Sequence, residues 1–205
     1  MTSIDNFIRV PYGSTVHGQE EIDAVVEVLK TSTQMSKNVS EFEEKIASTF
    51  SHDYGIMVNS GSSALYLAME ALDLQKGSEV ITPALTFATT VGCLVKNNLI
   101  PVFVDVGHDT YCIDPMQVEE KITERTSAIC APDLMGNICD WSILRELAEK
   151  YSLKIIHDSA DTLGAKLGGI STGAFSDISI TSFYGSHVIN GAGNGGMITT
   201  SDKDI

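Results

Sequence analysis

The chain has 205 residues, 43% of them hydrophobic, which is enough for one large domain with a well-buried core. Its formal net charge is −14, with 13 basic and 27 acidic residues. Binding to nucleic acid or to an acidic membrane needs clustered Lys and Arg, and the sequence contains no such cluster, so neither is an expected partner. The acidic residues are spread along the chain, which indicates a solvated surface rather than an acidic tail.

The sequence also shows no sign of a membrane span or a secretion signal. No apolar run approaches the ~20 residues that a bilayer span needs. The N-terminus, MTSIDNFIRV, lacks the basic and then apolar regions of a signal peptide. The cysteines at positions 93, 112, 130 and 139 form no CxxC pair, so reduced and largely buried thiols are expected. Cytoplasm is therefore the expected location.

The first 50 residues predict an irregular segment followed by two amphipathic helices. Residues 1–18 show no periodicity and are expected to be irregular. Asn38, with Glu41 three residues later, resembles the N-cap and capping box of the second helix. Apolar residues recur with the spacing of one helical face at Ile22, Val25, Val26 and Leu29, and again at Val39, Phe42, Ile46 and Phe50.

From Tyr54 onward, short β-prone runs alternate with helical patterns, which indicates an α/β domain with a mainly parallel sheet buried on both faces. Asp114-Pro115 is a fitting N-cap and first-turn pair for one of the helices. Near Gly168-Gly169 the rhythm changes, and a hairpin-like excursion is expected. The expected strands are 54–58, 80–83, 100–106, 127–131, 154–157, 178–183 and one from 197, and the expected helices are 62–74, 87–97, 115–122 and 141–150.

Ligands of such sheets bind outside the carboxyl ends of the strands, so the residues that follow strands are candidates for a site. Asn59-Ser-Gly-Ser-Ser63 lies between a strand and a helix, where free N–H groups and hydroxyls would suit a phosphate. Plain N-capping by Ser60 or Ser62 is the alternative. Asp158 could hold a proton on a ring nitrogen or cap the next turn, and Phe87 could be a stacking platform or part of the core.

The segment 181–200 carries a single imidazole, His187, in a loop that then becomes rich in glycine. A lone histidine is a weak signal, because a satisfied surface histidine is the more usual explanation. The run from Gly191 to Gly196 satisfies GxGxxG, but a strand pattern follows it, whereas a dinucleotide fingerprint must open a helix. The other histidines, at 17, 52, 108 and 157, show no metal-ligand spacing, so no metal site is expected.

Several ordered motifs resemble the DegT/DnrJ/EryC1/StrS sugar aminotransferases, vitamin-B6-dependent enzymes acting on nucleotide-linked 4-keto sugars. The resemblance covers almost the whole chain. It implies a fold-type-I PLP-dependent transferase large domain over 19–205, with a mostly parallel seven-stranded sheet, helices on both faces, and a small C-terminal domain that this chain does not include. The motifs are Asn59-Ser-Gly-Ser-Ser-Ala-Leu65, Ile81-Thr-Pro-Ala-Leu-Thr-Phe87, Phe103-Val-Asp-Val106, Tyr111-x-Ile-Asp-Pro115, His157-Asp-Ser-Ala-Asp161 and Ser182-Phe-x-x-x-His187.

The resemblance also implies roles for individual residues. Phe87 would stack on the pyridine ring of the cofactor, Asp158 would pair with the ring nitrogen, and Asp161 would lie near the ring hydroxyl. The cofactor phosphate would be bound by Gly61, Ser62, Ser63 and Ser182.

One departure from the family pattern changes the expected chemistry. His187 occupies the position where the aminotransferases have the lysine that holds the cofactor covalently. This replacement resembles the 3-dehydratase branch, in which pyridoxamine phosphate is held noncovalently. Part of that branch carries an iron–sulfur cluster with a cysteine at the position of Ala160, so the cluster-free form is the better match.

The expected function is therefore PMP/PLP-dependent 3-dehydration of an NDP-4-keto-6-deoxy sugar, with His187 as base and then acid, because imidazole exchanges protons near neutral pH. The resemblance implies glutamate as the amino donor and a homodimer with the active site at the interface. Two alternatives stay open: an aminotransferase using another base, and a non-catalytic family member. The length favours a fragment that lacks a complete sugar pocket.

Overall fold

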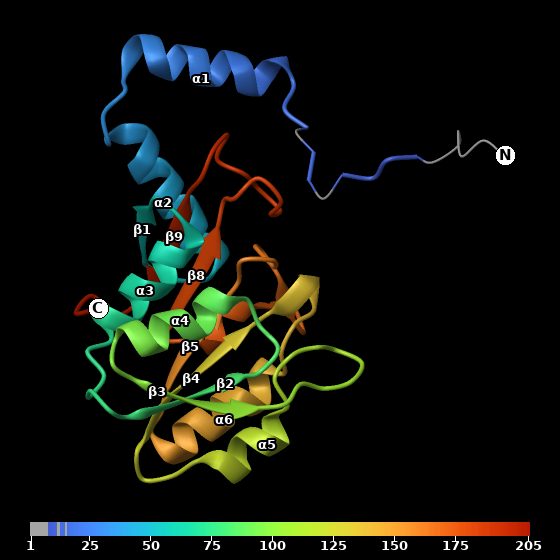
Figure 1. The fold of residues 1–205 in the computed structure, drawn as a ribbon. Helices are drawn as coiled ribbons and strands as arrows, with labels where there is room; N and C mark the ends of the chain where they lie inside the picture. The colour runs from blue at the N-terminus through green and yellow to red at the C-terminus, as the bar shows by residue number, and fades with distance from the viewer. Residues whose placement is uncertain (1–7, 12, 15) are drawn as a thin grey trace, which may run out of the picture. The chain divides into compact units, whose positions relative to one another are not determined.

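The computed structural model describes residues 8–11, 13, 14 and 16–205 (Figure 1). Half of the segment predicted to be irregular lies outside the described residues, and its described part, up to Gly18, contains neither helix nor strand. By contacts the chain divides into two compact units, one ending at Gln34 and one spanning Met35–Ile205. The first unit contains the predicted helix α1 (Gln19–Thr31), whose apolar stripe is exposed.

The second unit follows the predicted strand–helix alternation. Its helices are α2 (Lys37–Thr49), α3 (Gly61–Ala71), α4 (Ala88–Lys96), α5 (Pro115–Lys121) and α6 (Trp141–Tyr151), with short 3-10 turns η1 (Leu134–Gly136) and η2 (Thr172–Phe175). Its strands are β1 (Tyr54–Val58), β2 (Glu79–Pro83), β3 (Ile100–Val104), β4 (Thr126–Pro132), β5 (Lys154–Asp158), β6 (Lys166–Leu167), β7 (Ile170–Ser171), β8 (Ile178–Ser182) and β9 (Gly196–Thr200).

The helix caps agree with the prediction in one case and correct it in another. The Asp114 carboxylate accepts from the N–H of Met116 at 3.0 Å and opens α5 as expected. The prediction of Asn38 as the N-cap of α2 is wrong, because that helix begins at Lys37 and Ser36 is its N-cap. Serine is as good an N-cap residue as asparagine, and the Ser36 backbone (φ −149°, ψ −139°) is the one outside the helical region.

Seven strands form one sheet in the order β1-β9-β8-β5-β4-β2-β3. The pairs β2–β3, β2–β4, β4–β5 and β5–β8 are parallel, and β9 runs antiparallel to both β8 and β1. The predicted seven-stranded, mostly parallel sheet is therefore confirmed. The predicted excursion at Gly168-Gly169 is the separate hairpin β6–β7.

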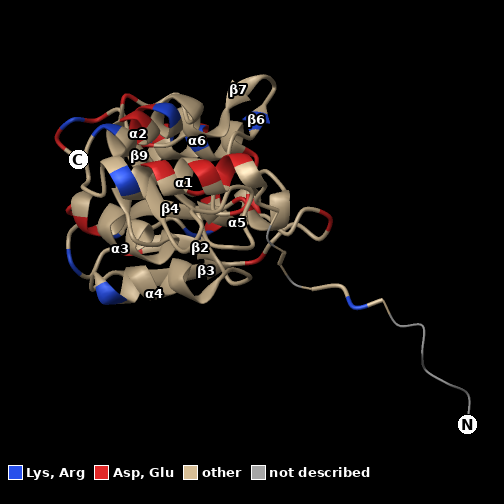
Figure 2. Cartoon of the chain, turned by 90° about the horizontal axis from the view of Figure 1, so that it is seen from above, with Lys and Arg blue, Asp and Glu red and all other residues tan. Residues whose placement is uncertain are grey.

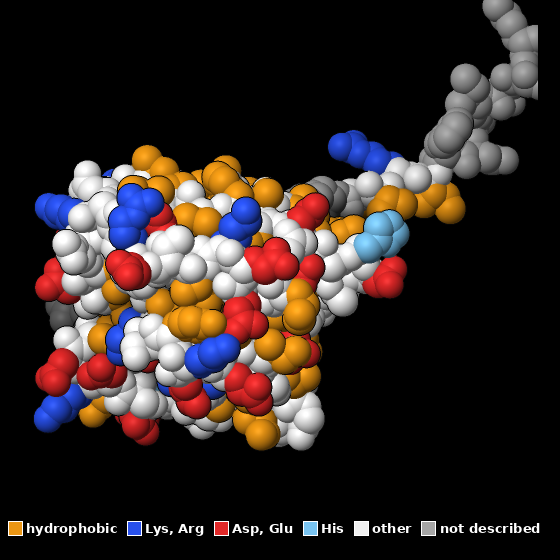
Figure 3. All heavy atoms as spheres, turned by 90° about the horizontal axis from the view of Figure 1, so that it is seen from below, with side chains coloured by type: hydrophobic (Ala, Val, Ile, Leu, Met, Phe, Trp, Pro, Cys, Tyr) orange, Lys and Arg blue, Asp and Glu red, His pale blue; other side chains and the backbone are white. Residues whose placement is uncertain are grey.

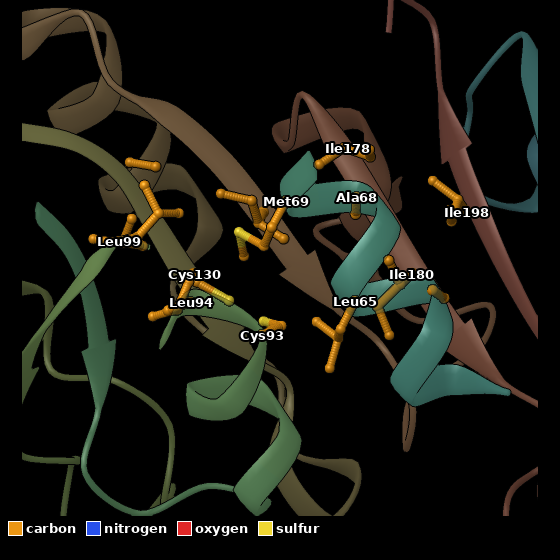
Figure 4. Packing of buried hydrophobic residues seen from close by; sticks show 14 residues of the cluster. Leu65, Ala68, Met69, Cys93, Leu94, Leu99, Cys130, Ile178, Ile180 and Ile198 are labelled. Carbon is orange, nitrogen blue, oxygen red and sulfur yellow. The ribbon is translucent and has the colours of Figure 1, made fainter. Parts of the chain in front are cut away.

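Alternating side chains of the central strands point into two different cores, because successive residues of a strand face opposite sides. Cys130 and Ile156 pack with α3 and α4 in one core, part of which is shown in Figure 4. Their sequence neighbours Ile129 and Ile155 pack with α5 and α6 in the other. Figure 1 shows these helix pairs on opposite faces of the sheet, as predicted.

The edges of the sheet are less buried than its centre. Side chains of β1 and β3, the two edge strands, are partly exposed, which departs from the expected burial of every strand. A third small core, containing Ile46, Phe50, Phe183 and Met197, joins α2 to the β9 side of the sheet.

Charges are dispersed over the second unit. Figure 2 shows Lys and Arg on separate helices and loops, and Figure 3 shows apolar side chains interrupted by acidic and basic ones. The four cysteines are free and buried, as predicted. Within the described part of the chain, no helix is long and apolar enough to cross a membrane.

Candidate active site

The predicted site residues lie along one edge of the sheet, where the strands that carry them end. Pro132 at the end of β4 is in register with Asp158 at the end of β5, and Asp158 is in register with Ile180 of β8. β8 ends two residues later at Ser182, which pairs with Gly196 of β9. Parallel strands therefore bring residues far apart in sequence to a common edge.

The phosphate end of the candidate site depends on close backbone packing. A Cβ placed on Gly61 would lie 2.6 Å from the Cβ and 2.9 Å from the Oγ of Ser182, so the two predicted phosphate ligands touch. A Cβ on Gly196 would lie 2.4 Å from the backbone C and O of Ser60. Both glycines are therefore needed to hold β8, β9 and the start of α3 together.

Ser60 caps α3 with its side chain, accepting from the N–H of Ser63 at 3.1 Å. The capping alternative is thus confirmed for Ser60. Capping occupies one helix N–H, and the hydroxyls of Ser62 and Ser182 lie at the same end of the helix. The two interpretations are compatible, and phosphate binding stays a prediction.

Asp158 is a buried carboxylate with two neutral donors. Its side chain is only 5% exposed, and burial raises its pKa. The N–H of Ala160 donates to Oδ1 at 3.2 Å and the hydroxyl of Thr90 donates to Oδ2 at 3.1 Å, and both contacts act in the opposite direction. Asp158 therefore caps the following turn and also presents a carboxylate at the strand end.

Phe87 is the N-cap of α4 and its side chain is 69% exposed. The core alternative for this residue is therefore wrong. An aromatic ring held at a helix start and left open is available to stack on a planar ligand.

Behind Asp158 lies a buried polar cluster for which the sequence analysis assigned no role. The Asp133 carboxylate accepts from the Nε2 of His157 at 2.9 Å and from the indole N–H of Trp141 at 3.0 Å. The N–H of Cys139 and the hydroxyl of Thr162 complete the set at 2.8 and 3.2 Å. Asp133 comes directly after β4, at the same edge of the sheet as Asp158, and this position was the only feature of the sequence that could have indicated a role for Asp133.

Asp133 is also tied directly to the candidate site. Its backbone N–H donates to the carbonyl of Asp158 at 3.0 Å. The cluster thereby fixes the end of β5 from behind, and it fixes the backbone from which Asp158 projects.

His187 lies next to Asp161, a contact that the sequence did not predict. Its Nε2 is 3.7 Å from Asp161 Oδ1, within ion-pair range, and Asp161 Oδ2 accepts from the N–H of Met135 at 3.0 Å. His187 Nδ1 is buried and has no hydrogen-bond partner among the described residues. The histidine is therefore mostly enclosed, with a side chain 20% exposed, and its Nδ1 is not engaged by any described residue.

Met135 holds Asp161 through an uncommon backbone conformation. It lies in the left-handed region (φ 57°, ψ 29°), followed by Gly136 at φ 86°. This turn directs the Met135 N–H at Asp161. Non-glycine residues seldom adopt it, and such positions are often found at functional sites.

An apolar hollow lies elsewhere on the molecule. It measures about 310 Å³ and is lined by Tyr54, Ile56, Leu67, Glu70, Ala71, Ile198, Thr200 and Ile205, none of which belongs to the candidate site. Among the described residues, no three His, Cys, Asp or Glu side chains gather as metal ligands.

The residues present fit a phosphorylated pyridine. A helix start with serine hydroxyls suits a phosphate, an open aromatic ring suits a planar ring, and a buried carboxylate suits a protonated ring nitrogen. On an α/β sheet of this order, these features define a pyridoxal-phosphate-dependent enzyme of fold type I.

Comparison with known proteins identifies the family. The family model described as "DegT/DnrJ/EryC1/StrS aminotransferase family" matches residues 16–205, and the chain belongs to this family of PLP-dependent, sugar-modifying enzymes. A transaminase for dTDP-3-amino-3,6-dideoxy-α-D-galactopyranose from Aneurinibacillus thermoaerophilus is 40% identical over 167 residues, covering 82% of this chain and 46% of the relative.

Two solved structures of 3-dehydratases superpose closely. An E. coli GDP-4-keto-6-deoxy-D-mannose 3-dehydratase with bound hydrated PLP matches with a TM-score of 0.90 and 30% identity, covering 97% of this chain and 52% of that one. A GDP-4-keto-6-deoxymannose 3-dehydratase with a trapped PLP-glutamate geminal diamine matches at 0.89 and 29%, covering 95% and 52%. The chain spans about half the length of the curated relatives it matches.

Proposed function

We propose that this chain forms the cofactor half of an active site that removes the C3 hydroxyl of an NDP-4-keto-6-deoxyhexose. The observation that carries the proposal is His187 paired with Asp161, at the position where the aminotransferases have their cofactor-binding lysine. The nearest lysines in sequence, Lys166 and Lys203, are 21 and 16 residues away from 187. Pyridoxamine phosphate is therefore held noncovalently.

The chain's own residues divide the work of binding. Ser62, Ser63 and Ser182, with Gly61 allowing close approach, hold the phosphate at the start of α3. Phe87 covers one face of the ring, and Asp158 keeps the ring nitrogen protonated. When bound, pyridoxamine phosphate supplies the amine that condenses with the C4 ketone and a protonated ring that withdraws electrons.

His187 then acts as the base and the acid. Because Asp161 faces Nε2, it favours the tautomer with the proton on Nε2, which leaves the lone pair on the buried Nδ1. With the cofactor and sugar bound, Nδ1 would take a proton at the cofactor's C4′ carbon and would give it to the C3 hydroxyl oxygen of the sugar, which would leave as water. One imidazole is sufficient for both transfers, and a lysine there would also bind the cofactor aldehyde covalently.

Glutamate and a second copy of the chain complete the proposed cycle. Glutamate as the amino donor is supported by the related dehydratase structure that holds a PLP-glutamate adduct. A homodimer is supported by the exposed side chains of Tyr184, Val188 and Ile189 beside His187, which would be covered by a partner subunit.

A turnover assay tests the role of His187. With pyridoxamine phosphate and an NDP-4-keto-6-deoxyhexose, the wild type should release a 3-deoxy-4-keto sugar. His187→Asn should slow this by roughly a hundredfold or more, the usual contribution of general acid–base catalysis. His108→Asn is the matched control, since that side chain is fully exposed. Undiminished turnover in His187→Asn, or an aminated product that keeps its C3 oxygen, would contradict the proposal.

A second measurement tests the noncovalent cofactor without needing a complete sugar pocket. Wild-type protein incubated with pyridoxal phosphate and borohydride should carry no covalent label, and His187→Lys should acquire one on residue 187. Labelling of the wild type at any lysine of the site would show that a Schiff base forms and would favour the aminotransferase alternative.

A further inference from the structure

Asp158 has to stay ionised in a place that opposes ionisation. Burial raises the pKa of its carboxyl, because a charge is costly to hold away from water. A carboxylate that pairs with a protonated ring nitrogen must nevertheless be negative. The groups that oppose the effect of burial therefore matter for the site.

A hydrogen-bonded pair of threonines supplies one of these groups. Thr90 is fully buried in the first turn of α4, and its hydroxyl donates to Asp158 Oδ2 at 3.1 Å. The hydroxyl of Thr86 donates to Thr90 Oγ1 at 2.9 Å. A hydroxyl has a single proton, so the bond received from Thr86 leaves the Thr90 proton directed at Asp158.

The same helical turn also carries the predicted stacking residue. The Thr90 N–H donates to the carbonyl of Phe87 at 3.0 Å. The start of α4 therefore positions two groups of the proposed site. These are the Phe87 ring, which would cover one face of the cofactor, and the Thr90 hydroxyl, which donates to Asp158.

We propose that Thr90, oriented by Thr86, is a positioning residue that keeps Asp158 ionised and directed at the ring nitrogen of the cofactor. This inference rests on the proposed cofactor site. The Ala160 N–H is fixed by the backbone, so Thr90 is the adjustable donor. Each carboxylate oxygen keeps a further acceptor position for the ring N–H.

Other titratable groups face Asp158 from each neighbouring element. His157 precedes it on β5, Asp161 follows it, Cys93 lies on α4 and Cys130 on β4. The two thiols are buried, and burial raises the pKa of Cys93 to about 12. They stay neutral at physiological pH, so a change at Thr90 leaves their charge unaltered.

The test compares two substitutions that separate packing from hydrogen bonding. Thr90→Val keeps the shape and removes the hydroxyl, whereas Thr90→Ser keeps the hydroxyl and removes a methyl. A role in positioning predicts that Val is the harmful change and that Ser resembles the wild type. A purely structural role predicts the reverse, because Ser leaves a small cavity.

The first readout needs no cofactor. Carbon-13 NMR titration of the Asp158 carboxyl, assigned with Asp158→Asn, should show its pKa rising by about one to two pH units in Thr90→Val, since a hydrogen bond to a charged group is lost. Thr90→Ser should titrate like the wild type. An unchanged Asp158 titration in Thr90→Val would overturn the role of Thr90.

The second readout uses pyridoxamine phosphate labelled with nitrogen-15 in the ring. In wild type and Thr90→Ser the bound ring should give the signal of a protonated nitrogen, and in Thr90→Val the signal should move towards that of a neutral pyridine. Wild-type protein that binds no pyridoxamine phosphate would overturn the proposed cofactor site. Normal binding with identical nitrogen signals in all three proteins would overturn the Thr90 proposal alone.

Discussion

Gly196→Ala should damage both the fold and the cofactor site, because the added methyl group meets backbone rather than a movable side chain. Its Cβ would lie 2.4 Å from the C and O of Ser60 and 2.7 Å from the N of Gly61. Gly196 is paired on both sides, with Val58 and with Ser182, so β9 cannot retreat without loosening the sheet. Overpacking of this kind costs about 1–3 kcal/mol.

Thermal unfolding and cofactor titration measure the two effects. For a chain of this size, the expected cost lowers Tm by roughly 2–12 °C, at about 2–4 °C per kcal/mol. The affinity for pyridoxamine phosphate should fall as well, because the displaced Ser60-Gly61 backbone begins α3. Gly193→Ala is the matched control, since its Cβ would meet nothing within 4 Å. Equal stability of the two variants would refute the packing argument.

Three further predictions concern buried polar groups. Burial lowers the pKa of His52 from its ordinary 6.5, so on acidification the unfolded chain binds the proton first and the stability of the fold should decrease as pH drops below about 6.5. His52→Gln should make the unfolding free energy less dependent on pH in unfolding curves measured at several pH values. An equally steep dependence in the variant would contradict the assignment to His52. Asp133→Ala should cost about 4 kcal/mol or more in the unfolding free energy, because four buried donors lose their acceptor at about 1–3 kcal/mol each, whereas the exposed control Asp109→Ala should leave the midpoint unchanged. The thiols of the native protein, including Cys93 with a pKa raised to about 12, should not react with a thiol reagent until the chain unfolds; fast labelling of the folded protein would show that the core opens.

The order and type of the elements in Met35–Ile205 could be predicted from the sequence, because they depend on local patterns. Alternating runs such as Ile178–Ser182 and capping pairs such as Asp114-Pro115 act over a few residues. The sequence order of the motifs also indicated which residues would meet at the strand ends. The capping prediction at Asn38 failed because adjacent polar residues compete for the same position, and local pattern does not decide between them.

The contacts that give the site its chemistry depend on the tertiary structure. Asp161 and His187 are 26 positions apart, and the turn at Met135 that holds Asp161 comes from a third segment. Nothing in a sequence pattern assigns Thr90, 68 positions before Asp158, as a donor to its carboxylate. For the buried cluster around Asp133, the sequence indicated only that Asp133 follows a strand, and none of its contacts.

The sequence by itself therefore determined the α/β sheet, the family motifs and the presence of histidine where a lysine is usual, since these follow from residue identity and local periodicity. The tertiary structure decided which side chains face one another across strands β4, β5 and β8 and the start of α4. Hydrogen bonds and ion pairs require contact within a few ångströms, and the register of the folded sheet places side by side the strand ends from which these segments leave.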